Sequence, residues 1–412
     1  MSFNKSKLAV AVAAAASFTF SSGAFATNGI IQAGNGMVAH GLGGAGISNA
    51  NEAAAGMDNP ALIGRTGDSI SVAWSIFMPD REVVQPAALG GATVVSDSNQ
   101  FAIPQAAFTS KINDAMSWGI MAYALGGMNT NYRTGALGNP ATPPEGVNLQ
   151  GLIVAPTVSY AFNKKVTAGA ALLIGYANLT GRNLFAGFNA VNGTFDDTSV
   201  GFGVKLGVDA KVTDSISIGA IFQPQMKFDE FNGFKTFLNN NFGYTGDASI
   251  PLPTTFGLGS KFAVAKSMDI VADILYYQWT GNEVFEAFGW EDQVVYKIGL
   301  EFRPSDTLAL RVGLNYGESP IKGGNRTANF PGFGAADAAF ANYLFPAIST
   351  THITMGLGYK MDKSLTLNAY YLHSPEASET ATTASFGGMI PPGTTISMTQ
   401  NAFGLGINYA TK

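Results

Sequence analysis

The segment VGFGVKLGVD, residues 200 to 209, contains the pattern that decides the fold. Its even-numbered residues are Val, Phe or Leu, and its odd-numbered residues are Gly, Lys or Asp. Such alternation is typical of a β-strand that has one apolar face and one small or polar face. The same alternation recurs after residue 67, most clearly in three further segments: Ile70–Met78, Val294–Phe302 and Leu308–Tyr316.

The connections between such segments alternate in length. Six short polar turns and seven long loops give fourteen strands, an even number, with short turns at one end and long loops at the other. This layout is typical of a bacterial outer-membrane barrel, whereas a soluble sandwich has no reason to sort its loops by length. We therefore predict an all-β fold, a 14-stranded antiparallel transmembrane β-barrel. The predicted strands are Asp68–Met78, Asn99–Ser110, Trp118–Met128, Leu152–Phe162, Val166–Leu179, Val200–Val212, Ile216–Glu230, Pro251–Val264, Asp269–Trp279, Asp292–Arg303, Leu308–Tyr316, His352–Met361, Leu365–His373 and Thr395–Tyr409.

The composition also favours a membrane barrel over a soluble secreted β-protein, which remains the alternative. Only 12% of the 412 residues are charged, while 50 are glycine and 11% are aromatic. After the N-terminus there is no apolar run of about 18 residues, the length that a spanning helix needs. The chain has no cysteine, which excludes disulfides and thiolate chemistry. It also lacks the basic stripe of a nucleic-acid-binding protein.

Residues 1–26 have the three parts of a secretory signal peptide in the right order. Lys5 and Lys7 are basic, Leu8–Phe20 is apolar, and Ala24–Ala26 matches the A-x-A cleavage pattern. We therefore expect export, cleavage before Thr27, and insertion into the outer membrane of a Gram-negative bacterium as a multi-pass protein.

Residues 27–67 are rich in glycine, alanine and asparagine and fit neither a regular helix nor a regular strand. An eight-stranded barrel is already filled by its own side chains, so a fourteen-stranded barrel needs additional filling. Glycine permits the irregular turns of such a filler. We predict that residues 27–67 form a plug inside the lumen and that residues 68–412 form the barrel.

This N-terminal segment closely resembles the hatch of the FadL/TodX family. The matching residues are GLGGAG at 41–46, NANEAA at 49–54 and DNPAL at 58–62. The resemblance implies an outer-membrane transporter for long-chain fatty acids or aromatic hydrocarbons, with gating by the hatch around Asn59, Pro60 and Ala61. It also implies a kink in the third strand that opens the wall sideways. One departure is the end of the chain, where Tyr409 is followed by three more residues instead of being the final aromatic residue.

Gly126 and Gly127 lie in that third predicted strand. Paired glycines weaken a β-ladder and permit a bulge, so they are candidates for the lateral opening. The other interpretation is that they only end the strand before a long loop. Gly41, Gly43 and Gly46 also match the G-x-G-x-x-G dinucleotide motif, but here no buried strand precedes them, so we do not expect nucleotide binding.

The alternation places several charged side chains in the lumen. Lys205, Lys297 and Arg311 are candidates to bind a ligand carboxylate through charge-assisted hydrogen bonds. Alternatively, these cations pair with Asp209 and Glu301 or anchor the plug.

Aromatic residues are concentrated in two of the predicted long loops. An exposed apolar patch normally marks a binding surface, and the resemblance implies a groove that captures the ligand. The alternative is that the loops pack against each other, and both can hold. The capture candidates are Phe185, Phe188, Phe234, Phe237 and Phe242.

The sequence offers little for catalysis. His40, His352 and His373 are scattered without a second ligand at metal spacing, so we expect no metal and no cofactor. His373 and Ser374 are the only neighbouring Ser and His, and no nucleophile-elbow motif is present. We expect a monomeric transporter, not an enzyme, that takes up hydrophobic small molecules passively and contacts outer-membrane lipid and lipopolysaccharide. A general diffusion porin or a structural barrel is the alternative.

Overall fold

The computed structural model describes residues 28–134, 143–185, 193–321, 327–330 and 334–410. Fourteen antiparallel strands form a closed wall, as predicted, and β1 closes the barrel by pairing with β18 from Ser69↔Ala410 to Val84↔Thr395. Among the described residues no helix is long and apolar enough to cross a membrane. The strands of the wall are β1 (Ser69–Val84), β3 (Phe101–Lys111), β4 (Met116–Tyr132), β5 (Glu145–Ala161), β6 (Val166–Arg182), β7 (Phe195–Lys211), β8 (Ile216–Gln223), β10 (Thr254–Ala265), β11 (Met268–Gln278), β12 (Gln293–Phe302), β13 (Leu308–Gly317), β16 (Thr351–Lys360), β17 (Leu365–Thr380) and β18 (Thr395–Ala410).

The outer face of the barrel is apolar. Phe202, Leu258 and Leu405 are each more than 60% exposed, an arrangement that is unfavourable in water and favourable in lipid. Each predicted strand overlaps a strand of the wall. The prediction Ile216–Glu230 ran too far, because β8 ends at Gln223, before Pro224, which has no N–H for the ladder. Several other predicted strands ended too early toward the long loops. Strand β1, for example, continues six residues beyond Met78 to Val84, and its outward residues there include Asp80 and Glu82. Backbone pairing therefore continues above the apolar band, where alternation no longer reveals it.

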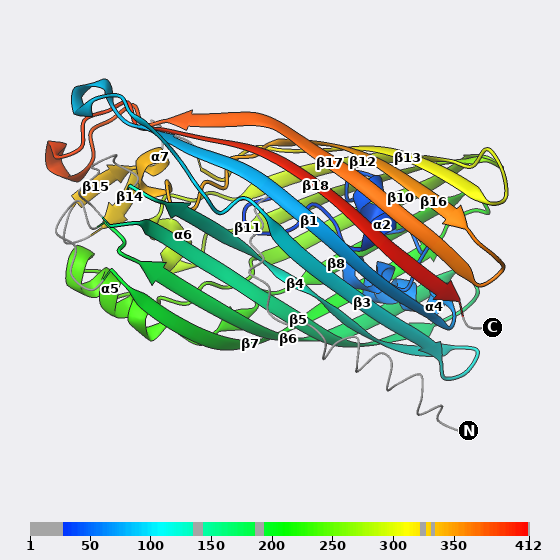
Figure 1. Cartoon of the computed structure of the whole chain (residues 1–412). Coiled ribbons are helices and arrows are strands. Elements are labelled where there is room, and N and C mark those ends of the chain that lie inside the picture. Colours follow the sequence, from blue (N-terminus) through cyan, green and yellow to red (C-terminus); the bar gives the residue numbers. More distant parts are fainter. Residues whose placement is uncertain (1–27, 135–142, 186–192, 322–326, 331–333, 411–412) are drawn as a thin grey trace.

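The long loops contain short elements of their own, gathered at one end of the barrel (Figure 1). They are η2 (Ala87–Leu89), β2 (Thr93–Val95), β9 (Lys227–Phe228), α5 (Asn232–Phe242), α6 (Glu283–Ala287), β14 (Thr327–Phe330), β15 (Gly334–Asp337), α7 (Ala338–Ala341) and η4 (Phe386–Gly388). The short turns lie at the opposite end, where β18 finishes (Figure 1). We call these the long-loop end and the short-turn end.

The described part of the N-terminal segment lies inside the barrel (Figure 1). It folds into α2 (Gly36–Gly41), α3 (Ala55–Asp58), η1 (Pro60–Leu62) and α4 (Ile63–Thr66). Most of its residues are buried, and they pack against the inner faces of the strands. We call residues 28–67 the hatch. Residues 1–27, including the expected signal peptide, lie outside the described residues.

Candidate functional site

The Asn-Pro-Ala triplet fastens the hatch to the wall. The Asn59 side chain accepts a hydrogen bond from Ala61 N–H at 3.0 Å, which caps η1, and Pro60 takes the first position of that helix. The Asn59 Nδ2 donates to Ile47 O within the hatch at 2.8 Å and to Val208 O on β7 at 3.1 Å. Asn59 is fully buried, so each of these bonds replaces one that water would otherwise make.

The glycine-rich run at 41–46 brings the backbone of the hatch against the backbone of the wall. A Cβ on Gly43 would lie 2.6 Å from Leu314 O of β13, and a Cβ on Gly313 would lie 2.0 Å from Gly43 N. Gly41 and Gly356 of β16 approach each other in the same way. The missing side chains permit backbone-to-backbone packing, which explains the glycine pattern without a nucleotide.

Buried charges join the hatch to the strands in the middle of the lumen. Lys205 Nζ donates to Met57 O at 2.9 Å, and Lys297 Nζ donates to Ala33 O at 2.7 Å. From the wall, Asp273 Oδ2 accepts Gly46 N–H and Ile47 N–H at 2.7 and 3.1 Å. Two of the three carboxylate-binding candidates are thus bonded to hatch carbonyls.

Within the hatch, a further buried carboxylate fixes the fold of the segment. Glu52 Oε1 accepts the Val38 N–H at 2.9 Å. Burial raises the pKa of the Glu52 carboxyl, because the charged form loses its hydration. The hatch is therefore braced internally as well as against the wall.

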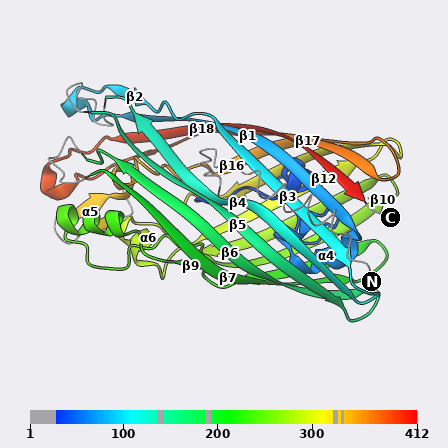
Figure 2. The same ribbon diagram turned by 60° about the horizontal axis from the view of Figure 1, so that its bottom comes forward.

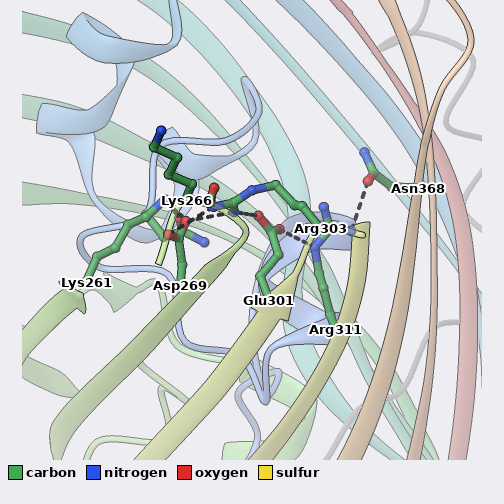
Figure 3. A network of polar contacts seen from close by, with 8 residues as sticks. Lys261, Lys266, Asp269, Glu301, Arg303, Arg311 and Asn368 are labelled. Carbon is green, nitrogen blue, oxygen red and sulfur yellow. Dashed lines mark hydrogen bonds and ion pairs between the residues drawn. The ribbon is translucent and has the colours of Figure 1, made fainter. Parts of the chain in front are cut away.

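Arg311, the third candidate, lies on the other side of the hatch, in a chain of charges near the short-turn end (Figure 3). Its Nε bonds Glu301 Oε2 at 2.7 Å, and its Nη1 donates to Asn368 Oδ1 at 3.1 Å. Arg303 bonds both Glu301 and Asp269, at 2.5 and 2.9 Å. Glu301, Arg303, Arg311 and Asn368 border a cavity of about 510 Å³ on the short-turn side.

The ladder between β3 and β4 is incomplete. It covers only Ala106–Lys111 and Ser117–Ala122. From Phe101 to Gln105, β3 pairs with β1 alone. The next bridge to β4 is Ser96↔Tyr132, beyond the end of β3. We call Phe101–Gln105 and the facing Tyr123–Met128 the unpaired stretch; β3 and β4 are neighbours on the near face in Figure 2.

Gly126 and Gly127 lie in this unpaired stretch. Gly126 has φ of 117°, and the pairing of β4 with β5 shifts between Ala124 and Gly126, which marks a bulge. The strand continues to Tyr132, so the interpretation that the glycines merely end the strand is wrong. A Cβ on Gly126 would lie 2.1 Å from Ile30 O, so the hatch occupies the space that the glycine leaves.

The backbone groups at the open edge of β4 form hydrogen bonds with the hatch and with a side chain of β1. Gly127 N–H donates to Ile30 O at 3.1 Å, Gln32 Nε2 donates to Ala124 O at 3.1 Å, and the Arg81 side chain donates to Asn129 O. Unpaired backbone groups are costly at membrane depth, so these bonds make the interruption tolerable. The hatch residues Ile30–Gln32 thus stand where the next stretch of β3 would otherwise pair.

On the facing strand, Gln105 completes the closure. Its Nε2 donates to Gln32 Oε1 at 3.3 Å, and its Oε1 accepts Gly36 N–H at 2.8 Å. Sequence reasoning missed Gln32, Gln105 and Arg81. A signal was present in Pro104, because proline has no N–H to donate and is found in strands that lack a partner on one side.

A cavity of about 80 Å³ lies between the hatch and the wall, beside the unpaired stretch. It is lined by Ile31 and Gln32 of the hatch, by Tyr123–Leu125 of β4, and by Lys205 and Lys297. A cavity of about 150 Å³ is the size known to hold benzene. The space must therefore enlarge before even a small aromatic compound can enter.

The loop aromatics pack against each other. Phe185, Phe234, Phe237 and Phe242 are all less than 7% exposed, so the exposed patch considered above is not found at these residues. The rings of Phe185 and Phe242 meet edge to face at 5.3 Å. Phe188 lies outside the described residues.

The catalytic alternative has no support from the geometry. His373 Nδ1 contacts Asn401 Oδ1 at 3.0 Å, while the neighbouring Ser374 points to the opposite face of β17, as adjacent strand residues do. Among the described residues, no group of three His, Cys, Asp or Glu side chains is placed to hold a metal ion.

Comparison with solved structures shows the same fold. The Pseudomonas putida toluene transporter TodX superposes with a TM-score of 0.68 at 17% identity, covering 93% of this chain and 100% of that one. A Pseudomonas aeruginosa FadL homologue superposes with a TM-score of 0.66 at 13% identity, covering 94% of this chain and 100% of that one. The Ralstonia pickettii toluene transporter TbuX superposes with a TM-score of 0.61 at 15% identity, covering 92% of this chain and 99% of that one.

A comparison with curated sequences finds no match. The model of one protein family, in contrast, matches residues 12–412, nearly the whole chain. This agrees with the hatch motifs and with the fourteen-stranded wall. The chain therefore belongs to the family of outer membrane protein transport proteins (OMPP1/FadL/TodX).

Proposed function

We propose that this protein carries hydrophobic compounds passively across the outer membrane, from the long-loop end to a lateral exit between β3 and β4. The observation that supports this most is the unpaired stretch, which ends at Ala106 and Ala122 and borders the cavity between the hatch and the wall. The ligands are aromatic hydrocarbons or long-chain fatty acids. Support for this class comes from the family and from neighbours named as toluene transporters.

A lateral exit suits an apolar solute. Such a molecule gains free energy by passing from the lumen into the bilayer, whereas the aqueous space beyond the barrel would cost it that gain. The polar chain around Glu301, Arg303 and Arg311 makes the route toward the short-turn end still less favourable for it. The wall beside the cavity is then the better exit.

In this proposal the moving part is the beginning of the hatch. Residues Ile30–Gln32 hold the open edge of β4 through two hydrogen bonds, while the rest of the hatch is fixed by Asn59, Lys205 and Lys297. Withdrawal of Ile30–Gln32 enlarges the cavity and frees the unpaired stretch together. The Asn59–Ala61 triplet serves as the fixed anchor of this movement.

A reversible cross-link tests the route. The chain has no cysteine, so Gln32→Cys with Gln105→Cys introduces a unique pair. A short bis-methanethiosulfonate linker joins the pair by forming a reducible disulfide with each thiol and releasing methanesulfinate. The readout is uptake of toluene and of palmitate by outer-membrane vesicles. If Ile30–Gln32 must withdraw, the linked protein loses uptake by about tenfold or more, as a locked gate does, and reduction restores it.

The matched control joins the hatch to the wall at a contact that the proposal keeps fixed. Ser48 Oγ donates to Asp209 Oδ1 at 2.6 Å, so Ser48→Cys with Asp209→Cys takes the same linker on β7. Uptake should then be unchanged by linking. Equal loss in both pairs would mean that the whole hatch moves, and no loss in either would remove the lateral route.

A further inference from the structure

Two loop turns form an uncharged projection at the long-loop end. No charged residue occurs from 83 to 96 or from 380 to 411. The turns touch, because a Cβ on Gly393 would lie 3.6 Å from Pro86 Cα. Leu89 and Met389 are 44% and 56% exposed. We call residues 86–95 with 385–393 the apolar tip; both turns lie at the far end of the molecule in Figure 1.

The apolar tip stands clear of the bilayer. On β18 the outward residues are apolar from Tyr409 to Phe403 and then polar from Asn401 to Thr395, so the lipid boundary falls near Phe403. Eight residues separate Phe403 from Thr395, which corresponds to about 20 Å of height for a strand tilted by about 40°. The exposed apolar side chains of the tip therefore do not contact the hydrocarbon core that the barrel spans.

The rest of the described rim differs from the apolar tip. The α5 loop carries Glu230, Lys235 and Asp247, and the α6 loop carries Glu283 and Glu286. Apolar side chains scattered singly over a surface are normal, whereas a contiguous apolar patch marks an interaction site. Lack of charge along both turns means that a partner with a hydrated or charged surface gains nothing there, while an apolar partner does.

The apolar tip is continuous with the aromatic interior of the loops. Directly before the exposed Met389, the Phe386 side chain is buried and packs on Phe242 and Phe340, with ring centroids 6.0 and 5.5 Å apart. Phe386 has φ of +54°, a region that side chains rarely adopt, and Gly387 and Gly388 also have positive φ. The surface that meets the solvent is thus one residue layer away from the buried cluster.

We propose that the apolar tip docks on a condensed apolar phase, such as a hydrocarbon droplet, and that Phe386 passes dissolved ligand from that phase into the aromatic cluster. This inference rests on the proposed transport of hydrophobic compounds. The inference concerns the source of the ligand. The protein takes up ligand directly from the droplet as well as from solution. Droplet contact places the ligand beside Phe386 without a step through water.

The test separates droplet contact from transport. Outer-membrane vesicles containing the full-length Leu89→Lys/Met389→Lys variant are mixed with hexadecane droplets, and vesicle adhesion is measured. Uptake of dissolved toluene is measured in the absence of droplets. The matched control, Thr236→Lys/Asn240→Lys, adds the same charges to exposed positions of α5. Adhesion by the tip variant should fall about tenfold relative to the control, with dissolved-toluene uptake within about twofold of wild type.

Each other outcome has a clear meaning. Unchanged adhesion, or equal loss in the α5 control, overturns the docking. The uncharged variant Leu89→Ser/Met389→Ser must also lose adhesion; if only lysine acts, charge repulsion explains the effect and the proposal fails. If native mass spectrometry shows a wild-type dimer that the tip variant lacks, the tip is an interface between copies and the docking is again overturned. Wild-type protein that takes up neither toluene nor palmitate from solution contradicts the proposed function instead.

Discussion

The hatch meets the wall in two different ways on its two sides. Toward β7, β12, β13 and β16 it is fastened: Gly41–Gly46 lies against strand backbone, and Asn59, Lys205 and Lys297 add buried hydrogen bonds. Toward β3 and β4 the residues Ile30–Gln32 lie where strand pairing is missing. On the first side each contact joins the hatch to a wall that is already complete. On the second side the hatch completes the wall.

The two sides differ in how much free energy a movement of the hatch would require. A bond between hatch and complete wall is lost outright when the hatch moves, leaving buried polar groups unsatisfied. At the edge of β4, withdrawal of Ile30–Gln32 breaks the bonds to Gly127 N–H and Ala124 O but leaves the rest of the hatch in place. Substitutions on the fastened side should therefore change stability, and substitutions at the edge of β4 should change transport.

The largest effect is expected from filling a backbone-to-backbone contact on the fastened side. In Gly313→Val the new Cβ would lie 2.0 Å from Gly43 N, a backbone atom that cannot swing away. We expect a loss of about 3 kcal/mol in the free energy of unfolding and an increase in ion conductance as the hatch is displaced. Urea unfolding measures the free energy, and planar-bilayer recordings measure the conductance. The lipid-facing Leu310→Val is the control, and normal conductance with normal stability would contradict tight docking.

Asn59→Ala removes the anchor without adding bulk. It takes away the cap of η1 and leaves Ile47 O and Val208 O without these donors, which should lower the free energy of unfolding by about 2 kcal/mol. Initial uptake of toluene should change little, because the anchor does not move in the transport step. The control is Thr66→Ala, which removes hydrogen bonds to Ile63 and Thr109 at the end of the hatch. A large change in uptake at unchanged stability would instead assign the triplet to gating.

Much of this arrangement was predictable from the sequence. Alternation and the alternating loop lengths together located all fourteen strands, because most strands have one face in lipid and one in the lumen. The inward direction of Lys205 and Lys297 followed from the same rule, and the glycine-rich motifs indicated a hatch. Strand ends near the long loops were predicted poorly, since pairing above the bilayer leaves no apolar pattern.

The unpaired stretch was not predictable, although Gly126 and Gly127 pointed to its strand. It depends on Gln32 meeting Gln105, residues 73 positions apart whose contact no local pattern encodes. The second predicted strand alternates weakly and contains Pro104, which in retrospect fits an edge without a partner. The burial of the loop aromatics was equally hidden, because apolar loop residues look the same in a sequence whether they face solvent or one another.

The variant Lys297→Met tests whether Lys297 anchors the hatch or binds the carboxylate of a ligand. The Lys297 Nζ already bonds Ala33 O, so its loss should lower the free energy of unfolding by about 1.5 kcal/mol. Uptake of palmitate and of toluene should then change by the same factor. A selective loss of palmitate uptake would show that Lys297 binds the carboxylate. Lys266→Met, at an exposed turn, controls for the lost charge.

The smallest effect is expected at the upper end of the unpaired stretch, where Arg81 of β1 bonds Asn129 O of β4. Arg81→Lys shortens the side chain and weakens this hydrogen bond by about 0.5 kcal/mol. That corresponds to about a twofold change in the equilibrium between the closed and open forms of the unpaired stretch. If opening of the unpaired stretch limits transport, toluene uptake should rise about twofold, because the edge of β4 is held less firmly. The exposed Arg133→Lys, whose partner is Asp97, should leave uptake unchanged. A fall in uptake would mean that Arg81 holds the edge in its open form, and the movable boundary would then lie at Ile30–Gln32 alone.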